Sequence, residues 1–239
     1  VGEESVSLYF EEEPIFSCLT AAACATEETE SVSGDSYSFL ETDDSVSMSL
    51  SDGVGSGESA ARDSGRIVDL TERILDAGLG PDMAMLFLNG MAGAEGDENR
   101  MATLDLCRID LYRGECETVK AGGAAGFIKR SNRVEKIQSR QLPLGMSASE
   151  DISEKKWQLN SGDLVILVSD GVVQNWPCGD GEYLLEQKIA SLNVSSPVDL
   201  ANLILRYAIR QCGGKIRDDM TVLVTGIWKN EEREIEDIE

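Results

Sequence analysis

Histidine is absent from this chain of 239 residues, and its absence excludes several functional classes. Histidine is the usual proton-transfer group near neutral pH, so histidine-dependent triads, haem ligation by histidine and the H-E-x-x-H zinc proteases are ruled out. The six cysteines form no C-x-x-C pair, which argues against a zinc site or a thioredoxin-like motif and favours free thiols in a reducing compartment. Any chemistry must use other side chains.

Basic residues are also scarce. Lys and Arg number 21 against 44 Asp and Glu, which gives a formal net charge of −23. Such a surface repels nucleic acid and anionic membranes, so we expect neither as a partner of this fragment. Phosphate chemistry would need bound cations or local basic residues. Part of the acidic excess lies in residues 230–239, which we predict to be a disordered, acidic tail.

Long apolar runs are missing as well, which excludes a membrane span within this chain. Hydrophobic residues still make up 41% of the sequence, enough for a globular core, and the length favours one domain, which we place at 1–229. The chain starts with valine and no signal-like segment. We therefore expect a cytoplasmic domain cut from a longer protein, and a membrane anchor elsewhere in that protein stays open.

Short apolar runs flanked by aspartate recur along the chain. Residues 46–50 and 164–168 both lead into Ser-Asp-Gly, and two further acidic sites precede apolar runs. The aspartates concerned are Asp35, Asp52, Asp170 and Asp218, with Asp219 beside the last. Each alone is an ordinary turn residue next to a strand. Charges about 4 Å apart repel by roughly 4 kcal/mol at an effective dielectric near 20, so converging aspartates would need a metal.

Periodicity predicts an α+β domain of mostly antiparallel sheet covered by helices. A hairpin over 37–41 and 46–50 would place Asp35 and Asp52 near the same end. Helices are predicted over 58–77, 82–92 and 181–192, and from Ser196 to about 212. The remaining strands are predicted over 5–10 at an edge, over 16–24 in a more buried position, and over 101–112, 115–120, 125–129, 133–138, 154–159, 164–168 and 220–228.

Aspartates without histidine or cysteine partners favour Mg²⁺ or Mn²⁺ over zinc. Two such ions about 3.5 to 4 Å apart can activate a water and hold both oxygens of a displacement at phosphorus. That chemistry needs no protein nucleophile. The glycines at 53–57 would let the backbone approach a metal or phosphate. The same run could cradle a nucleotide, although it lacks the full G-x-G-x-x-G spacing and a Walker lysine.

Four segments, VSGDSYSF, LSDGVGSG, LVSDGV and RDDMTVLV, resemble in order and separation the motifs of the metal-dependent protein phosphatase family, the PPM or PP2C type. MATLDL, GFIKR and LPLGM extend the similarity over nearly all of residues 30–228. Within the family, the match is closest to phosphatase domains of the stage II sporulation protein E type. The resemblance implies a two-layer antiparallel β-sandwich flanked by helices, with two Mn²⁺ or Mg²⁺ ions in its cleft.

The resemblance also implies the site residues. It gives the metal-ligating and catalytic roles to four aspartates: Asp35, Asp52, Asp170 and Asp218. Asp35 and Asp52 would bridge the metals or hold the water, and the carbonyl of Gly53 would complete one metal. The other two aspartates would close the site from the opposite side, with Asp219 as the alternative to Asp218.

The substrate implied is a phosphoserine or phosphothreonine protein, typically an anti-sigma-factor antagonist whose dephosphorylation frees a sigma factor in sporulation-type control. The helices at 58–77 and 82–92 would then act as a switch that moves the Gly53 carbonyl on or off the metal. In this subfamily the switch often accompanies dimerisation, so a homodimer stays open. An ordinary pair of covering helices explains the same sequence pattern.

Two departures from the family pattern limit the transfer of mechanism. Larger relatives use a histidine as general acid and an arginine near the N-terminus to hold phosphate, whereas the first arginine here is Arg62. Protonation of the leaving group would fall to a metal-bound water or stay undefined. The turn AGGA at 121–124 also replaces one that often carries proline.

Two other functions remain open at this level. One is a pseudophosphatase that binds a phosphoprotein without turnover, and the presence of all four aspartates counts against it. The other is an aspartyl-phosphate hydrolase with Asp170 as nucleophile. That chemistry would want an acidic residue two positions later, where Val172 stands.

Overall fold

The computed structural model describes residues 12–95, 102–131, 133–138, 141–146, 154–177 and 180–230, without the side chains of 93–95. The predicted edge strand at 5–10 lies outside these ranges, and so does the predicted acidic tail at 230–239 except for Asn230. The amide of Asn230 donates to the carbonyl oxygen of Ile15 at 2.9 Å, so the last described residue is still tied to the start of the first strand. The domain boundary at 229 stays a prediction.

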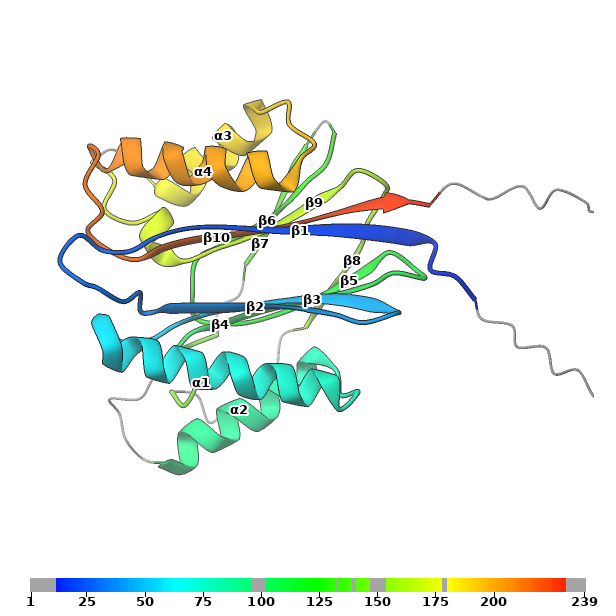
Figure 1. Ribbon diagram of the computed structural model, residues 1–239, viewed down its shortest axis with the longest axis horizontal. Helices are drawn as coiled ribbons and strands as arrows, with labels where there is room; N and C mark the ends of the chain where they lie inside the picture. Colours follow the sequence, from blue (N-terminus) through cyan, green and yellow to red (C-terminus); the bar gives the residue numbers. More distant parts are fainter. Residues whose placement is uncertain are drawn as a thin grey trace, which may run out of the picture.

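Two antiparallel sheets of five strands each form the centre of the molecule (Figure 1). Sheet A has the order β1 (Phe16–Ala25), β10 (Met220–Lys229), β9 (Leu164–Val168), β6 (Gly126–Lys129) and β7 (Val134–Ile137). Sheet B has the order β2 (Asp35–Glu41), β3 (Ser45–Asp52), β4 (Leu104–Asp110), β5 (Glu115–Ala121) and β8 (Lys155–Gln158). The predicted antiparallel sandwich is confirmed.

Helices cover the outer face of each sheet. In Figure 1, α1 (Gly57–Asp76) and α2 (Pro81–Glu95) lie on sheet B, whereas α3 (Gly181–Ser191) and α4 (Pro197–Gln211) lie on sheet A. A 3₁₀ turn, η1 (Asp170–Val172), follows β9. Ser196 caps α4 as predicted, because its hydroxyl accepts the amide of Asp199 at 3.2 Å. Among the described helices, none combines the length and apolar character that crossing a membrane requires.

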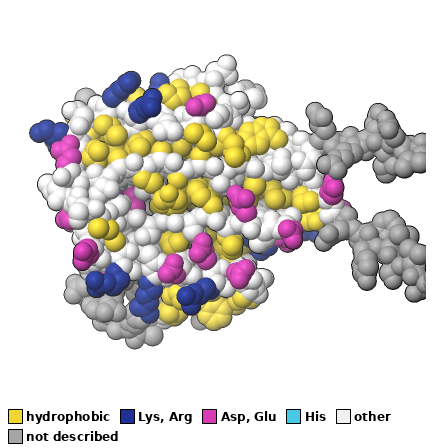
Figure 2. Space-filling view, viewed as in Figure 1, with side chains coloured by type: hydrophobic (Ala, Val, Ile, Leu, Met, Phe, Trp, Pro, Cys, Tyr) yellow, Lys and Arg dark blue, Asp and Glu magenta, His cyan; other side chains and the backbone are white. Residues whose placement is uncertain are grey.

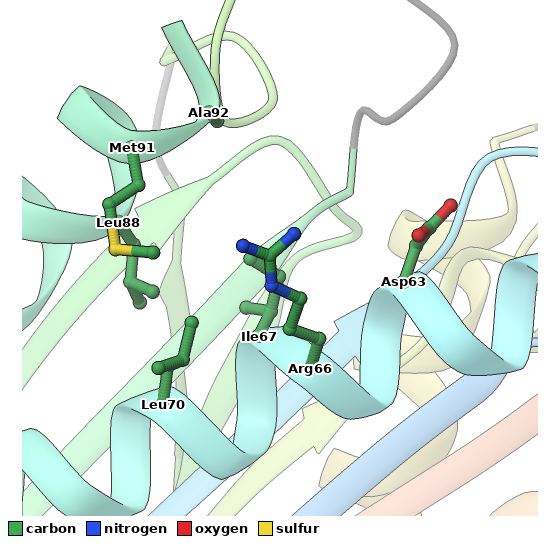
Figure 3. A pocket seen from close by; sticks show the side chains of 7 residues that line it. All are labelled: Asp63, Arg66, Ile67, Leu70, Leu88, Met91 and Ala92. Carbon is green, nitrogen blue, oxygen red and sulfur yellow. The ribbon is translucent and has the colours of Figure 1, made fainter. Parts of the chain in front are cut away.

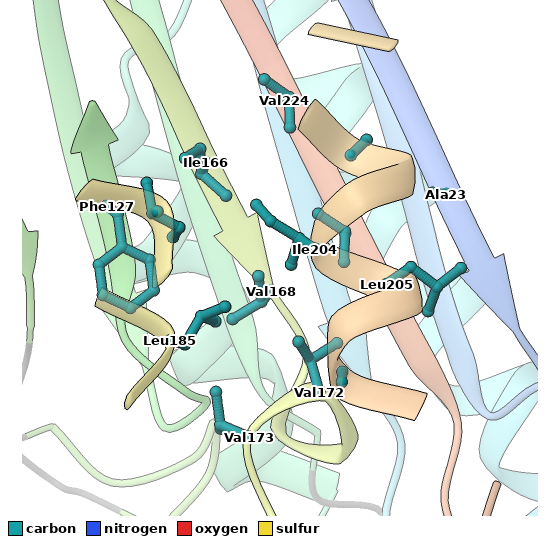
Figure 4. Packing of buried hydrophobic residues seen from close by; sticks show 14 of the residues in the cluster. Ala23, Phe127, Ile166, Val168, Val172, Val173, Leu185, Ile204, Leu205 and Val224 are labelled. Atoms are coloured by element: carbon teal, nitrogen blue, oxygen red, sulfur yellow. The ribbon is translucent and has the colours of Figure 1, made fainter. Parts of the chain in front are cut away.

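The apolar side chains form three layers, one between the sheets and one under each helix pair. Strand β9 contributes to two of them: Val165 and Leu167 point between the sheets, while Ile166 points toward α3 and α4. Figure 4 shows Leu185 of α3 and Ile204 of α4 packed in the layer over sheet A. Burial on both faces explains why β9 is aliphatic throughout. Such a strand is a rigid support for whatever follows its end.

Acidic residues do not gather in one patch on the face shown in Figure 2. They are scattered between rows of hydrophobic side chains, which follow the strands and the helices on either side of them. This face therefore offers no obvious charged docking surface.

Candidate active site

The sheet registers bring the four predicted aspartates together at one end of the sandwich. Asp35, the first residue of β2, pairs directly with Asp52, the last residue of β3. On sheet A, β9 and β10 run antiparallel, so Asp170 after β9 and Asp218 before β10 lie at the same edge. The two pairs meet across the sandwich, since Asp52 shares a hydrogen bond with Asp170 and is also repelled by the charge of Asp218.

Burial and mutual repulsion raise the pKa values of this cluster. Asp35 is 9% exposed, and burial is the main cause that raises its pKa to about 7, against the effect of hydrogen bonds from two neighbouring hydroxyls. For Asp52, burial and then the charge of Asp35 raise the pKa to about 8. Burial is likewise the main cause of the raised pKa of Asp170 and of Asp218. At neutral pH the cluster cannot ionise fully without a compensating cation.

The cluster fits a hard divalent cation. Its side-chain donors are carboxylate oxygens, which Mg²⁺ and Mn²⁺ prefer. One oxygen, Asp35 Oδ2, is buried and has no hydrogen-bond partner within the described residues. A bound cation would supply the missing partner. No three acidic or thiol side chains of the described ranges are already close enough to hold an ion.

Both glycines of the Ser-Asp-Gly motifs stand where another backbone segment passes too close for a side chain. A Cβ on Gly53 would lie 2.3 Å from the carbonyl oxygen of Ala60 in α1, and one on Gly171 would lie 2.2 Å from that of Asp219. Neither glycine has positive φ. The sequence suggested that these glycines let the backbone approach a metal or phosphate. The structure adds a second reason for glycine, the close passage of another backbone segment. The contact between Gly53 and α1 is compatible with the predicted switch, which stays a prediction.

Two residues outside the predicted set position the aspartates. Gln174 Nε2 donates to Asp170 Oδ2 at 2.7 Å, and Thr103 Oγ1 accepts the amide of Asp52 at 3.0 Å. The Gln174 bond spans four residues at the turn after β9, so the spacing could have indicated it. The Thr103 bond joins segments 51 residues apart, and no local sequence pattern predicts it.

Asp219 holds a loop in place. Its carboxylate accepts the amides of Glu27 at 2.9 Å and Gly34 at 2.6 Å, and the residue is 5% exposed. Both oxygens are therefore engaged with the backbone that leads into β2. Asp218 is half-buried, and after burial the charge of Asp170 is the next cause of its raised pKa. Of the two neighbours, Asp218 is the better placed to take part in the cluster.

A cleft of about 450 Å³ opens beside Asp170. It is lined by Gly123 and Ala124 on one side and by Asp180 and neighbouring residues at the start of α3 on another, with Gln174 also at its wall. Its size is in the range of ordinary ligand sites. Because Asp170 of the aspartate cluster lines this cleft, a phosphorylated side chain that enters it would reach that carboxylate.

A second cavity lies between α1 and α2, away from the cluster. Figure 3 shows Ile67 and Leu70 of α1 facing Leu88 and Met91 of α2, with Arg66 at the rim. Its volume is only about 30 Å³, close to that of one water molecule, and none of the four aspartates lines it. It is a gap in helix packing and offers no room for a substrate.

The chain is similar to known proteins in sequence and in fold. The family model described as stage II sporulation protein E (SpoIIE) matches residues 42–227. The chain is 35% identical over 213 residues to stage II sporulation protein E of Bacillus subtilis (strain 168), covering 88% of this chain and 26% of that protein. It is 24% identical over 200 residues to the phosphoserine phosphatase RsbU of the same organism, covering 81% and 59% respectively.

Among solved structures, the PP2C phosphatase domain of SpoIIE from Bacillus subtilis, determined with a fragment of its regulatory domain, superposes with a TM-score of 0.85 at 34% identity. The match covers 90% of this chain and 64% of that one. The chain thus spans about a quarter of the length of the sporulation protein that it matches. From the match to the family model and from these similarities in sequence and structure, the chain belongs to the stage II sporulation protein E family and has the fold of a PP2C phosphatase domain.

Proposed function

We propose that this domain hydrolyses phosphoserine or phosphothreonine in a protein with the help of two Mn²⁺ or Mg²⁺ ions. The ligands would be Asp35, Asp52, the carbonyl of Gly53, Asp170 and Asp218. The observation that carries the proposal is the convergence of these aspartates, with an unpartnered oxygen on Asp35, at the wall of a cleft. One relative is described as a phosphoserine phosphatase, and one structure of the Bacillus subtilis SpoIIE phosphatase domain was Mn presoaked.

When bound, such ions lower the pKa of a water molecule and neutralise charge on phosphoryl oxygens. The protein supplies orientation. Gln174 orients Asp170 through a hydrogen bond to Oδ2, and Asp219 holds the loop that leads to Asp35. Since histidine is absent, we expect the leaving serine oxygen to take its proton from solvent water.

We infer that the substrate is a phosphorylated regulatory protein of the anti-sigma-factor antagonist type. The inference rests on the resemblance to the sporulation phosphatases and on the phosphoserine phosphatase named among the relatives. The cleft is compatible with a protein segment, because it is open and wider than a single phosphoryl group needs.

The test is hydrolysis of p-nitrophenyl phosphate and of phosphorylated casein while Mn²⁺ is titrated. We expect saturable turnover that a chelator abolishes and that Asp170→Asn lowers by at least about 100-fold, since one ligand of the proposed metal site is lost. The matched control is Asp180→Asn, which changes an aspartate at the same cleft outside the cluster. Asp180 caps α3, and asparagine serves equally well as an N-cap.

Absence of turnover on both substrates would contradict the proposal. Calorimetric measurement of Mn²⁺ binding would then distinguish two other functions. A protein that binds no Mn²⁺ would be a binding module of the same fold. One that binds Mn²⁺ without turnover would be a pseudophosphatase, at least as an isolated domain.

A further inference from the structure

An ion pair lies buried inside the sandwich, in the strands next to the aspartate cluster. Asp105 of β4 and Lys120 of β5 stand directly opposite each other, and Lys120 Nζ contacts Asp105 Oδ2. The two residues are 2% and 3% exposed. Because side chains alternate along a strand, both point the same way as Cys107 and Cys116, which belong to the apolar layer between the sheets. Two charges are therefore enclosed in the core.

Stability alone does not account for this pair. Removing two charges from water costs more than their attraction returns unless further hydrogen bonds satisfy them, so apolar residues often serve such a site at least as well. Here those bonds are missing. Within the described residues, Asp105 Oδ1 has no partner and Lys120 Nζ has none beyond Asp105. Burial raises the pKa of Asp105 to about 6 in spite of the adjacent lysine.

The pair lies directly behind the cleft wall. Residues 122–125, hereafter the cleft turn, leave β5 two residues after Lys120, and Gly122 and Gly123 have φ of +70° and +72°. A Cβ on Gly123 would lie 3.0 Å from Asp105 Oδ1, so the carboxylate lies close beside this glycine of the turn. The front of the turn lines the cleft, which Asp170 also lines.

The far end of the cleft turn is held by a second charged group. The amide of Ala125 donates to Glu182 Oε1 at 2.9 Å, and Lys136 Nζ pairs with Glu182 Oε2 at 2.7 Å. The turn is thus fixed between Asp105 behind it and Glu182 at the start of α3. Neither the amide of Gly123 nor that of the next residue has a hydrogen-bond partner in the described part of the chain. A turn held in this position keeps the amide of the exposed Gly123 available to a bound segment.

We propose that Asp105 and Lys120 are positioning residues that hold the cleft turn in place as the wall against which a phosphoprotein segment binds. The inference rests on the proposed phosphatase function and adds a determinant of substrate class to it. A protein substrate extends beyond its phosphoryl group and needs the wall. A small aryl phosphate needs only the aspartates and their ions.

The test compares kcat and KM for phosphorylated casein and p-nitrophenyl phosphate in the double variant Asp105→Asn/Lys120→Met. Both charges are removed together because a single change would leave the other charge buried alone. We expect KM for casein to rise at least about tenfold, while kcat for both substrates and KM for the small ester change less than about threefold. The matched control is Asp163→Asn/Arg130→Met, which removes an ion pair at the opposite end of β9 and should leave both substrates unaffected.

An equal loss on both substrates would overturn the inference, because the pair would then support the metal centre or the whole fold. Unchanged KM for casein would overturn it too. If the double variant does not fold, Asp105→Asn/Lys120→Gln provides a neutral pair that can still form a hydrogen bond. We then expect a smaller rise in KM for casein, again without a matching change for the small ester.

A second readout separates this inference from the proposed function. If the unmodified domain hydrolyses neither substrate, the phosphatase proposal fails. Amide hydrogen exchange then tests whether Asp105 and Lys120 hold the cleft turn in place. Exchange of the Ala125 amide, which donates to Glu182 Oε1, should accelerate at least about tenfold in the double variant, while amides of β3 keep their rates. Unaltered exchange in the turn would refute a positioning role for Asp105 and Lys120.

Discussion

Replacing Asp35 by asparagine should stabilise the metal-free protein at pH 8 and abolish its response to manganese. Asp35 is a buried carboxyl whose pKa is raised to about 7, mainly by burial. A group of this kind binds more protons in the folded than in the unfolded protein between its ordinary pKa of 3.8 and about 7. The contribution of Asp35 to the stability of the metal-free wild type therefore falls as pH rises through that window and levels off above it.

The magnitude follows from the size of the shift. At about 1.4 kcal/mol per pKa unit, the ionised carboxylate costs roughly 4 kcal/mol at pH 8 and roughly 1.5 kcal/mol at pH 5. Asparagine removes this cost but weakens the hydrogen bonds from Ser169 and Thr221, each worth about 1 kcal/mol. We expect a net gain of about 1–3 kcal/mol at pH 8, or roughly 3–10 °C in Tm for a domain of this size. At pH 5 the gain should be close to zero.

Thermal unfolding at pH 5 and pH 8, with chelator or with Mn²⁺, measures both effects. Saturating metal should stabilise the wild type by about 2.7 kcal/mol at a hundred times Kd and should leave Asp35→Asn unchanged. The control is Asp44→Asn at the other end of the β2–β3 hairpin. The pKa of Asp44 is lowered, chiefly by a hydrogen bond from Thr42. The ionised carboxylate therefore contributes its full share to the stability of the fold above its ordinary pKa, and this share is the same at pH 5 and pH 8.

Two results would refute this reasoning. One is equal destabilisation of Asp35→Asn at pH 5 and pH 8, which would mean that the carboxylate is compensated in the metal-free fold. The other is unimpaired stabilisation of the variant by Mn²⁺, which would place the metal elsewhere.

Three further substitutions, one of them with a matched control, test the supports of the site. Gly53→Ala would press a methyl group into the backbone of α1 and should lower the free energy of unfolding by about 1–3 kcal/mol in urea titration. Gly65→Ala in α1, where the nearest atom would be 3.6 Å away, should instead raise it by about 0.5–1 kcal/mol, and equal losses would contradict the steric argument. Gln174→Leu should reduce turnover or Mn²⁺ affinity about 10- to 100-fold by releasing Asp170, and unchanged values for both would exclude an orienting role. Asp219→Ala leaves two buried amides without an acceptor and should cost about 2–4 kcal/mol in urea titration, whereas a loss below about 0.5 kcal/mol would show that the loop holds without it.

The hairpin around Asp35 and Asp52 could be predicted because every signal for it is local. Serines alternate with apolar residues over 46–50, a turn of two aspartates separates the strands, and antiparallel pairing then sets the two carboxylates at one end. The helix starts could be predicted equally well, as the cap at Ser196 shows. The ends of strands were predicted less accurately: the strand expected over 101–112 is regular only at Leu104–Asp110.

The buried ion pair could not have been predicted in the same way. The pattern along β4 and β5 places charged residues among apolar ones, and charge normally indicates a solvent-facing position. Asp105 and Lys120 instead face inward, because both sheets cover them. Nothing in either strand shows that a second sheet lies above it.

The sequence by itself determined which residues end strands, which segments form helices and which carboxylates are candidates for a metal site. These depend on turn residues and on the period of apolar positions, which act over a few residues. Only the tertiary structure decided that Thr103 supports Asp52, that Asp219 secures the loop before β2, and that the cleft turn rests on a buried ion pair. Those contacts join residues that are distant in sequence, and their geometry exists only once the strand order and the packing of the two sheets are established.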